Sequence, residues 1–228
     1  MLPQPVVPPV PGTVLRNPRG LATAVTALLG VVAALDLFAL YSGVVMHRLT
    51  GDLLSHSSDE IDQADNRYEM TGSVQLAAMG VTAVVFIIWF HRVRSNADAF
   101  AQDVCTRTRG WAVGGWFIPL GNLWIPYTIA REVWTASAQR APGGSWREVS
   151  ERPIATWWWT WVAALLVYRF GTTMQEHADT PDTLQRATDV ILVADALNLA
   201  AAVLAIVFVR KLTAMQHTKA TLGPIAAV

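Results

Sequence analysis

The stretch DVILVADALNLAAAVLAIVFV, residues 189–209, decides the fold class of this chain. After Asp189 its only polar residues are Asp195 and Asn198. A helix rises about 1.5 Å per residue, so a run of this length crosses the ~30 Å hydrocarbon core of a bilayer. A helix on the surface of a soluble domain would carry one polar face, which this run lacks. The run is therefore predicted to be a transmembrane helix.

Three similar apolar runs lie on its N-terminal side, so the predicted spans are residues 21–45, 72–90, 154–174 and 189–209. Lipid cannot hydrogen-bond to open backbone groups, so each run must be helical. Hydrophobic residues make up 53% of the chain and charged residues 15%, against about 25% charged in soluble domains. These features predict an all-α fold, a bundle of four transmembrane helices within one membrane domain, residues 20–212.

The flanks of the spans predict their orientation. Residues 1–19 are proline-rich and are predicted to be a disordered tail, and residues 213–228 form a second tail. Basic residues gather in these tails and in residues 91–153, whereas the other two loops contain only Arg48, Arg67 and Arg186. The positive-inside rule then places both termini in the cytoplasm.

Two compositional features complete this picture of location. Arginine far outnumbers lysine, beside abundant alanine and valine, which favours a GC-rich bacterial genome and hence a bacterial plasma membrane. A cluster at the start of the third span is predicted to form an interfacial aromatic belt, and its members are Trp157, Trp158, Trp159 and Trp161.

The long loop between the second and third spans contains an amphipathic or re-entrant segment, residues 96–140. Asn96 is predicted to cap a short helix, and Pro126 suits the first turn of another. Residues 111–126 between them are apolar, but glycine and proline break them too often for a membrane span. On the second helix one face is expected to contact the membrane, namely Ile129, Ala130, Val133 and Trp134, while Arg131 and Glu132 face water.

The string GWFIPLGNLWIPYTIAREVW, residues 115–134, resembles the signature of a bacterial membrane-protein family called domain of unknown function 4328. The residues that carry the resemblance are Trp111, Gly115, Trp116, Phe117, Ile118, Pro119, Asn122, Leu123, Trp124, Pro126, Glu132 and Trp134. The resemblance covers residues 20–212. It implies a four-helix membrane fold, often with a proline-rich N-terminal tail, and it implies no activity.

Five polar residues lie inside the predicted spans: Asp36, Gln75, Arg169, Asp195 and Asn198. A charge at the middle of a membrane helix costs roughly 2.5–3.5 kcal/mol on insertion scales, so each needs a physical reason. Counted from the cytoplasmic ends of the spans, the first four lie at nearly the same depth. They are predicted to form one polar layer towards the outer leaflet.

This layer allows three interpretations. It can be polar glue that fixes helix pairing, with Gln75 and Asn198 as hydrogen-bonding partners. It can instead bind a proton or a cation, because two aspartates and one arginine leave a negative charge, or it can bind a larger ligand. Arg169 alone can also extend to the outer surface.

The rest of the sequence bounds the function. Cys105 is the only cysteine and is expected to be an inert thiol, and no histidine pair has metal-binding spacing, so no metal and no cofactor are predicted. Catalytic and phosphate-binding motifs are missing, and a net charge of zero argues against nucleic acid.

The leading hypothesis is therefore a non-enzymatic protein that senses the bilayer or binds a protein partner through an aromatic collar of Trp111, Trp116, Trp124 and Trp134. The alternative is a small transporter or channel subunit that uses the polar layer. Because four helices enclose little volume, the alternative calls for a homo-oligomer. An intramembrane enzyme with Asp36 and Asp195 as a carboxylate pair is a third hypothesis.

Overall fold

The computed structural model describes residues 15–51, 57–145 and 147–226, so residues 1–14 of the predicted N-terminal tail lie outside it. The described residues form helices and loops and contain no β-strand. The helices are α1 (Arg19–Gly51), α2 (Ser58–Phe100), η2 (Gln102–Val104), α3 (Trp111–Gly114), η3 (Gly121–Leu123), α4 (Ile125–Ser137), α5 (Arg152–Glu176) and α6 (Pro181–Leu222). The all-α prediction is confirmed.

The chain divides into two compact units. Unit 1 consists of Met1–Ala22, Ile87–Glu151 and Lys211–Val228, and unit 2 of Thr23–Phe86 and Arg152–Arg210. Helices α1, α2 and α6 each contribute residues to both units.

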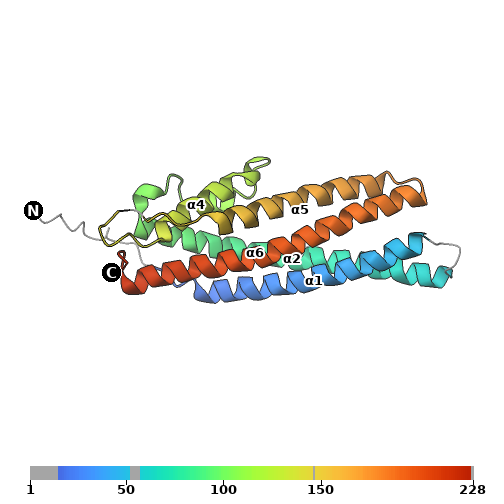
Figure 1. Ribbon diagram of the computed structural model, residues 1–228, viewed down its shortest axis with the longest axis horizontal. Coiled ribbons are helices and arrows are strands. Elements are labelled where there is room, and N and C mark those ends of the chain that lie inside the picture. Colours follow the sequence, from blue (N-terminus) through green and yellow to red (C-terminus); the bar gives the residue numbers. More distant parts are fainter. Residues whose placement is uncertain (1–14, 52–56, 146, 227–228) are drawn as a thin grey trace, which may run out of the picture. The chain divides into compact units, whose positions relative to one another are not determined.

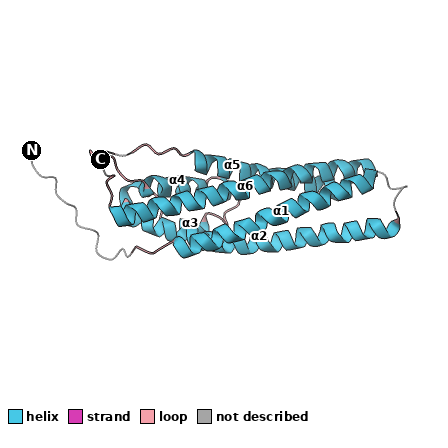
Figure 2. Ribbon diagram, turned by 60° about the horizontal axis from the view of Figure 1, so that its bottom comes forward, coloured by secondary structure: helices cyan, strands magenta, loops and turns pink. Residues whose placement is uncertain are grey.

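In unit 2, α1, α2, α5 and α6 lie side by side (Figure 1; Figure 2). The ring of Trp157 stacks on that of Phe208, with centroids 4.7 Å apart and an interplanar angle of 10°, and lies 5.5 Å from the ring of Phe86. A Cβ added at Gly171 would lie 2.8 Å from Cγ1 of Ile191, so α5 and α6 approach closely there. Small residues at such crossings are typical of helices packed in membranes.

Unit 2 exposes large apolar side chains on its helices. Leu37 on α1, Leu76 on α2 and Phe170 on α5 are 58%, 73% and 62% exposed, whereas Asp36 and Asp195 are 0% and 6% exposed. Water would disfavour such large apolar faces, and lipid would not. Among the described residues, three helical stretches are long and apolar enough to cross a membrane, namely Arg19–Leu49, Asp62–Phe100 and Pro181–Leu222.

Helix α5, the predicted third span, is not among these three stretches. Tryptophan counts as weakly polar on hydropathy scales, and α5 contains four tryptophans near its start. The predicted aromatic belt needs correction, since Trp157 and Trp158 are 5% and 0% exposed and belong to the core, whereas Trp159 is 57% exposed.

The helices continue well beyond the predicted spans. α2 runs to Phe100, so the prediction that Asn96 caps a separate helix is wrong. α6 runs to Leu222, through residues that the sequence assigned to a tail. An apolar run shows where lipid-compatible residues end, while the backbone continues as a helix wherever protein contacts support it.

Asn96 instead fixes several parts of unit 1 together. Its Oδ1 accepts a hydrogen bond from the backbone N–H of Arg16 (2.9 Å), and its Nδ2 donates to the backbone oxygen of Arg16 (2.8 Å) and to Oε1 of Gln216 (3.0 Å). Nε2 of Gln216 donates to the backbone oxygen of Val93 (2.8 Å) and to Oγ of Ser137 (3.1 Å). Both amide side chains are buried, so this network joins α2, α4, α6 and the segment before α1.

Pro126 lies in the first turn of α4, which confirms that prediction. The apolar face of α4 does not face a membrane as predicted, because Ile129, Ala130 and Val133 are 0% exposed and Trp134 is 3% exposed. This face packs against the protein of unit 1. Periodicity identifies an apolar face, but lipid and protein cover such a face equally well.

Lys219 on α6 closes the C-terminal end of α4. Its Nζ donates to the backbone oxygens of Ala136 and Ala138, both at 2.8 Å, and lies 5.5 Å from the centroid of the Phe100 ring. A cation is well placed at the negative end of a helix. Lys219 is 4% exposed, so few waters can replace these bonds.

We expect Lys219→Met to lower the free energy of unfolding of the solubilised protein by roughly 2 kcal/mol, because two buried carbonyls lose a charged donor. Thermal unfolding followed by tryptophan fluorescence measures this change. Lys211→Met is the matched control, since Lys211 is exposed on the same helix. Equal effects of the two substitutions would contradict the capping role.

Candidate cation site in unit 2

Three helices of unit 2 each turn one row of side chains towards the same region. On α2 the row contains Tyr68, Gly72, Gln75 and Met79; on α5 Trp161, Leu165, Tyr168 and Thr172; and on α6 Ile191, Asp195 and Asn198. Within each row the residues are three or four positions apart, the spacing that puts side chains on one face of a helix.

Asp36 on α1 is held by two amide side chains. Nδ2 of Asn198 donates to Oδ1 at 2.9 Å and to Oδ2 at 3.0 Å, and Nε2 of Gln75 also donates to Oδ1. Asp36 is completely buried, so these bonds replace its hydration. They join α1, α2 and α6 at the level of the predicted polar layer, which is the arrangement expected of polar glue.

Asp195 is in a different situation. It is 6% exposed, and no basic side chain forms an ion pair with it in the part of the chain that the structure describes. The Gln75 side chain is its hydrogen-bond partner, and the charged group that acts on it is another carboxylate, Asp36. A single amide hydrogen bond does not neutralise a buried carboxylate, so this position favours a positively charged neighbour.

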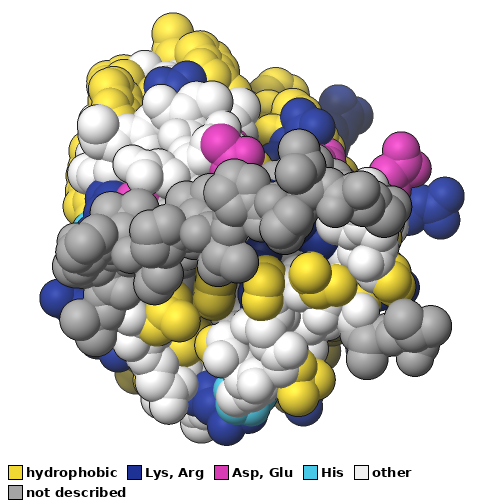
Figure 3. All heavy atoms as spheres, turned by 90° about the vertical axis from the view of Figure 1, so that its left-hand side faces the viewer, with side chains coloured by type: hydrophobic (Ala, Val, Ile, Leu, Met, Phe, Trp, Pro, Cys, Tyr) yellow, Lys and Arg dark blue, Asp and Glu magenta, His cyan; other side chains and the backbone are white. Residues whose placement is uncertain are grey.

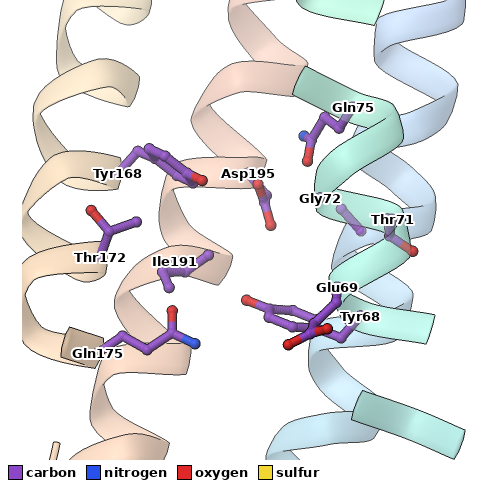
Figure 4. Close-up of a pocket in the computed structure, with 11 residues that line it drawn as sticks. Tyr68, Glu69, Thr71, Gly72, Gln75, Tyr168, Thr172, Gln175, Ile191 and Asp195 are labelled. Carbon is purple, nitrogen blue, oxygen red and sulfur yellow. The ribbon is translucent and has the colours of Figure 1, made fainter. Parts of the chain in front are cut away.

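A cavity of about 180 Å³ lies in front of the Asp195 carboxylate (Figure 4). The side chains of Tyr168 from α5 and Tyr68 from α2 point into it. Its lining combines two acids, two amides and two hydroxyls with the tyrosines, namely Glu69 and Asp195, Gln75 and Gln175, Thr71 and Thr172, together with Ala39, Gly72 and Ile191. We call it the polar pocket. It contains several oxygen acceptors and no basic side chain.

A second cavity, of about 200 Å³, adjoins the first. Its lining is mostly apolar and consists of Leu76, Met79, Trp161, Ala164, Leu165, Ala194 and Asn198, together with four residues shared with the polar pocket, Gly72, Gln75, Tyr168 and Asp195. We call it the apolar pocket. Asp195 therefore stands where a polar and an apolar space meet.

Arg169 does not join the layer. It is exposed, and none of the described ion pairs links it to Asp36 or Asp195. Consecutive residues on a helix point about 100° apart, and the preceding Tyr168 is the residue that lines both pockets. Depth along a helix was predicted correctly enough to bring three helices together at one level, but depth says nothing about which side of the helix a residue occupies.

Tyr68 and Tyr168 were not singled out by sequence reasoning. A signal was available, because Tyr68 is seven residues before Gln75 and Tyr168 is seven residues after Trp161, which puts each pair on one helix face. Tyrosines near the ends of membrane helices are common as interfacial anchors, so this spacing does not by itself indicate a pocket.

The sequence motif of residues 111–134 lies in unit 1, and only part of it is exposed. Trp111 and Trp124 are 37% and 53% exposed, and Pro119 is also exposed. Trp116 and Asn122 are half-buried, and Trp116 meets the ring of Phe90 edge-on with centroids 6.1 Å apart. Pro126 and Trp134 are buried. Of the four tryptophans in the predicted collar, only Trp111 and Trp124 are therefore exposed.

Two further sequence expectations concern chemistry in unit 1. Burial raises the pKa of the Cys105 thiol to about 12, so at neutral pH it is almost wholly protonated and a poor nucleophile. Asp98 nearby accepts hydrogen bonds from Arg94 and from Nε of Arg109, the latter at 2.6 Å. In the described ranges no group of three or more His, Cys, Asp or Glu side chains is placed to hold a metal ion.

Comparison with known proteins indicates the family of the chain. No curated protein and no solved structure matches the chain. The model of one family, described as Domain of unknown function (DUF4328), matches residues 52–214. This region is more than half of the chain, it contains the 111–134 motif on which the resemblance was based, and it confirms that resemblance. The chain therefore belongs to the DUF4328 family.

Proposed function

We propose that this protein is a non-enzymatic protein of the bacterial plasma membrane, with four spans and both termini in the cytoplasm, that binds a cation at Asp195. The observation that carries the proposal is a buried carboxylate that faces a cavity and has no positive partner among the described residues.

The fourth span in this proposal is α5. With 25 residues it extends about 37 Å, enough to cross a ~30 Å hydrocarbon core. Its two buried tryptophans pack inside a bundle that exposes large apolar side chains. An even number of spans leaves both termini on one side, and the basic residues of the tails and of residues 91–153 favour the cytoplasm for that side.

A cation site within a membrane bundle supports a role in transport. Ionisable residues inside membrane helices commonly mark ion or substrate pathways. The two adjoining pockets are small, so a carrier or a subunit of a homo-oligomer fits them better than a pore.

The test is the binding of methylammonium to the full chain in lipid nanodiscs, measured by isothermal titration calorimetry. We expect saturable binding that Asp195→Asn weakens at least about tenfold, because the buried counter-charge of the cation is removed. Gly72→Phe should also weaken it, since a Cβ at Gly72 meets no atom within 4 Å and the ring would occupy the pocket.

Gly80→Phe is the matched control. Gly80 lies two turns further along α2, also has open space around a Cβ, and lines neither pocket. The proposal fails if methylammonium does not bind to the wild type, or if it binds to Asp195→Asn and to Gly72→Phe as tightly as to the wild type.

A second candidate function is contact with the membrane surface or a partner through the exposed part of the motif. Phe117 and Leu120 are 73% and 71% exposed, and Leu120 has φ 61°, an unfavourable backbone conformation for a side chain with a Cβ. Such strain at an exposed apolar residue is often functional. On the face shown in Figure 3, basic side chains lie around the surface with hydrophobic ones between them, as a headgroup layer would require.

A fluorescent label tests this second function. On a Cys105→Ser background, an environment-sensitive dye at Phe117→Cys should shift to the blue in anionic nanodiscs relative to detergent. The same dye at Gly143→Cys, an exposed loop position, should not. Identical spectra at both positions would exclude insertion of this segment into lipid.

A further inference from the structure

We infer that the cation bound at Asp195 is an organic ammonium that carries an apolar group, with its charged nitrogen in the polar pocket and the apolar group in the apolar pocket. The inference rests on the proposed function, that Asp195 binds a cation, and it adds the chemical class of the ligand.

The lining of the polar pocket disfavours a divalent metal ion. Calcium takes six to eight oxygen ligands, usually several of them carboxylates, and magnesium requires near-octahedral geometry. The described residues contain no group of three acidic, histidine or cysteine side chains placed around one point. Asp195 is buried, whereas Glu69, the other acid of the pocket, is exposed at its edge.

The same lining suits an ammonium group. A primary ammonium donates up to three hydrogen bonds, and the pocket offers a carboxylate and the amide oxygens of Gln75 and Gln175 as acceptors. Tyr68 and Tyr168 point into the pocket from two sides (Figure 4), so aromatic rings lie beside the space for the cation. Aromatic rings attract organic cations through their quadrupoles.

The apolar pocket indicates which kind of group is attached to the ammonium nitrogen. It adjoins the polar pocket through the shared residues Gln75, Tyr168 and Asp195, and its other walls include Met79, Trp161 and Leu165. At about 200 Å³ it exceeds the roughly 150 Å³ of an apolar cavity that holds one benzene ring. A hydrated inorganic ion would leave this space unused, and a substituted amine would fill both pockets.

The test compares benzylammonium with methylammonium on the full chain in nanodiscs by isothermal titration calorimetry, with empty nanodiscs subtracted to remove partition into lipid. Both cations have the same charged group, so their ratio of affinities isolates the apolar part. We expect benzylammonium to bind about thirtyfold more tightly, from the area of a buried phenyl ring.

A pair of neighbouring residues on α5 provides the matched variants. Leu165 lines the apolar pocket, whereas Leu166 lines neither pocket and is 57% exposed. Leu165→Asn should reduce the benzyl-to-methyl ratio several-fold, and Leu166→Asn should leave this ratio unchanged. Met79→Ala on α2 is a second variant of the same pocket, with Met70→Ala, exposed on the same helix, as its control.

The outcomes separate the two proposals. If neither amine binds, the cation site itself is absent. If both amines bind equally and both depend on Asp195, the cation site stands and the inference about an apolar group is overturned. A thirtyfold ratio that survives both Leu165→Asn and Met79→Ala would also overturn it, because the ring would then lie elsewhere.

Discussion

Replacing Asp36 by alanine is expected to lower the free energy of unfolding of the solubilised protein by about 3 kcal/mol or more. The carboxylate accepts three hydrogen bonds, two from Asn198 and one from Gln75, and hydrogen bonds to a charged group contribute about 1.5–3 kcal/mol each. Its loss would leave the Asn198 amide without its acceptor inside the bundle and remove one acceptor of Gln75. Thermal unfolding in detergent, together with the yield of monodisperse protein, measures the effect.

Asp195→Ala is the matched control for Asp36→Ala, since both residues are buried aspartates of unit 2. We expect its stability to equal or exceed that of the wild type, because the substitution removes a buried charge that has no positive partner. The difference in stability between the two variants distinguishes a structural role of Asp36 from a ligand-binding role of Asp195. Equal losses of stability in the two variants would mean that Asp195 is also part of the glue.

The second large effect is expected in unit 1, at Gly115 of the family motif. A Cβ at Gly115 would lie 2.6 Å from Cγ2 of Ile125 and 2.8 Å from the backbone oxygen of Trp111. Because one of these atoms belongs to the backbone, the loop has to shift. Overpacking of this kind typically costs 1–3 kcal/mol, so Gly115→Ala should lower the thermal unfolding midpoint clearly.

Gly114→Ala is the control, since a Cβ at Gly114 meets no atom within 4 Å and the residue lies within α3. Alanine is favoured over glycine inside a helix by roughly 1 kcal/mol, so this variant should be as stable as the wild type or more so. Equal midpoints for the two variants would show that the close contact at Gly115 is not required.

The apolar runs were sufficient to predict the fold class, because lipid-compatible residues in runs of this length permit only helices. The ends of the helices were not predictable in the same way. α2 and α6 continue past their apolar runs because contacts within unit 1, such as those of Asn96, Gln216 and Lys219, hold polar residues in helical conformation. A span is indicated by the length of its apolar run, whereas the end of a helix depends on contacts with the rest of the protein.

Only some residues of the candidate site could be predicted from the sequence. Asp36, Gln75, Asp195 and Asn198 could be identified because a polar residue in an apolar run needs a partner or a ligand. Arg169 was included by depth and lies outside the site, while Tyr168 beside it is part of it. Depth follows from counting residues, whereas the direction of a side chain depends on how the helix is rotated against its neighbours.

The sequence alone determined that this chain is built from apolar helices, that it belongs to the DUF4328 family and that a few polar residues lie within the spans. Composition and spacing carry this information because transfer of each residue between water and lipid is a local property. Only the tertiary structure decided that Asp36 is tied to two amides while Asp195 faces a cavity, and that the apolar face of α4 is covered by protein. Those outcomes depend on which helices pack together and in what rotation, and such contacts join residues far apart in the chain.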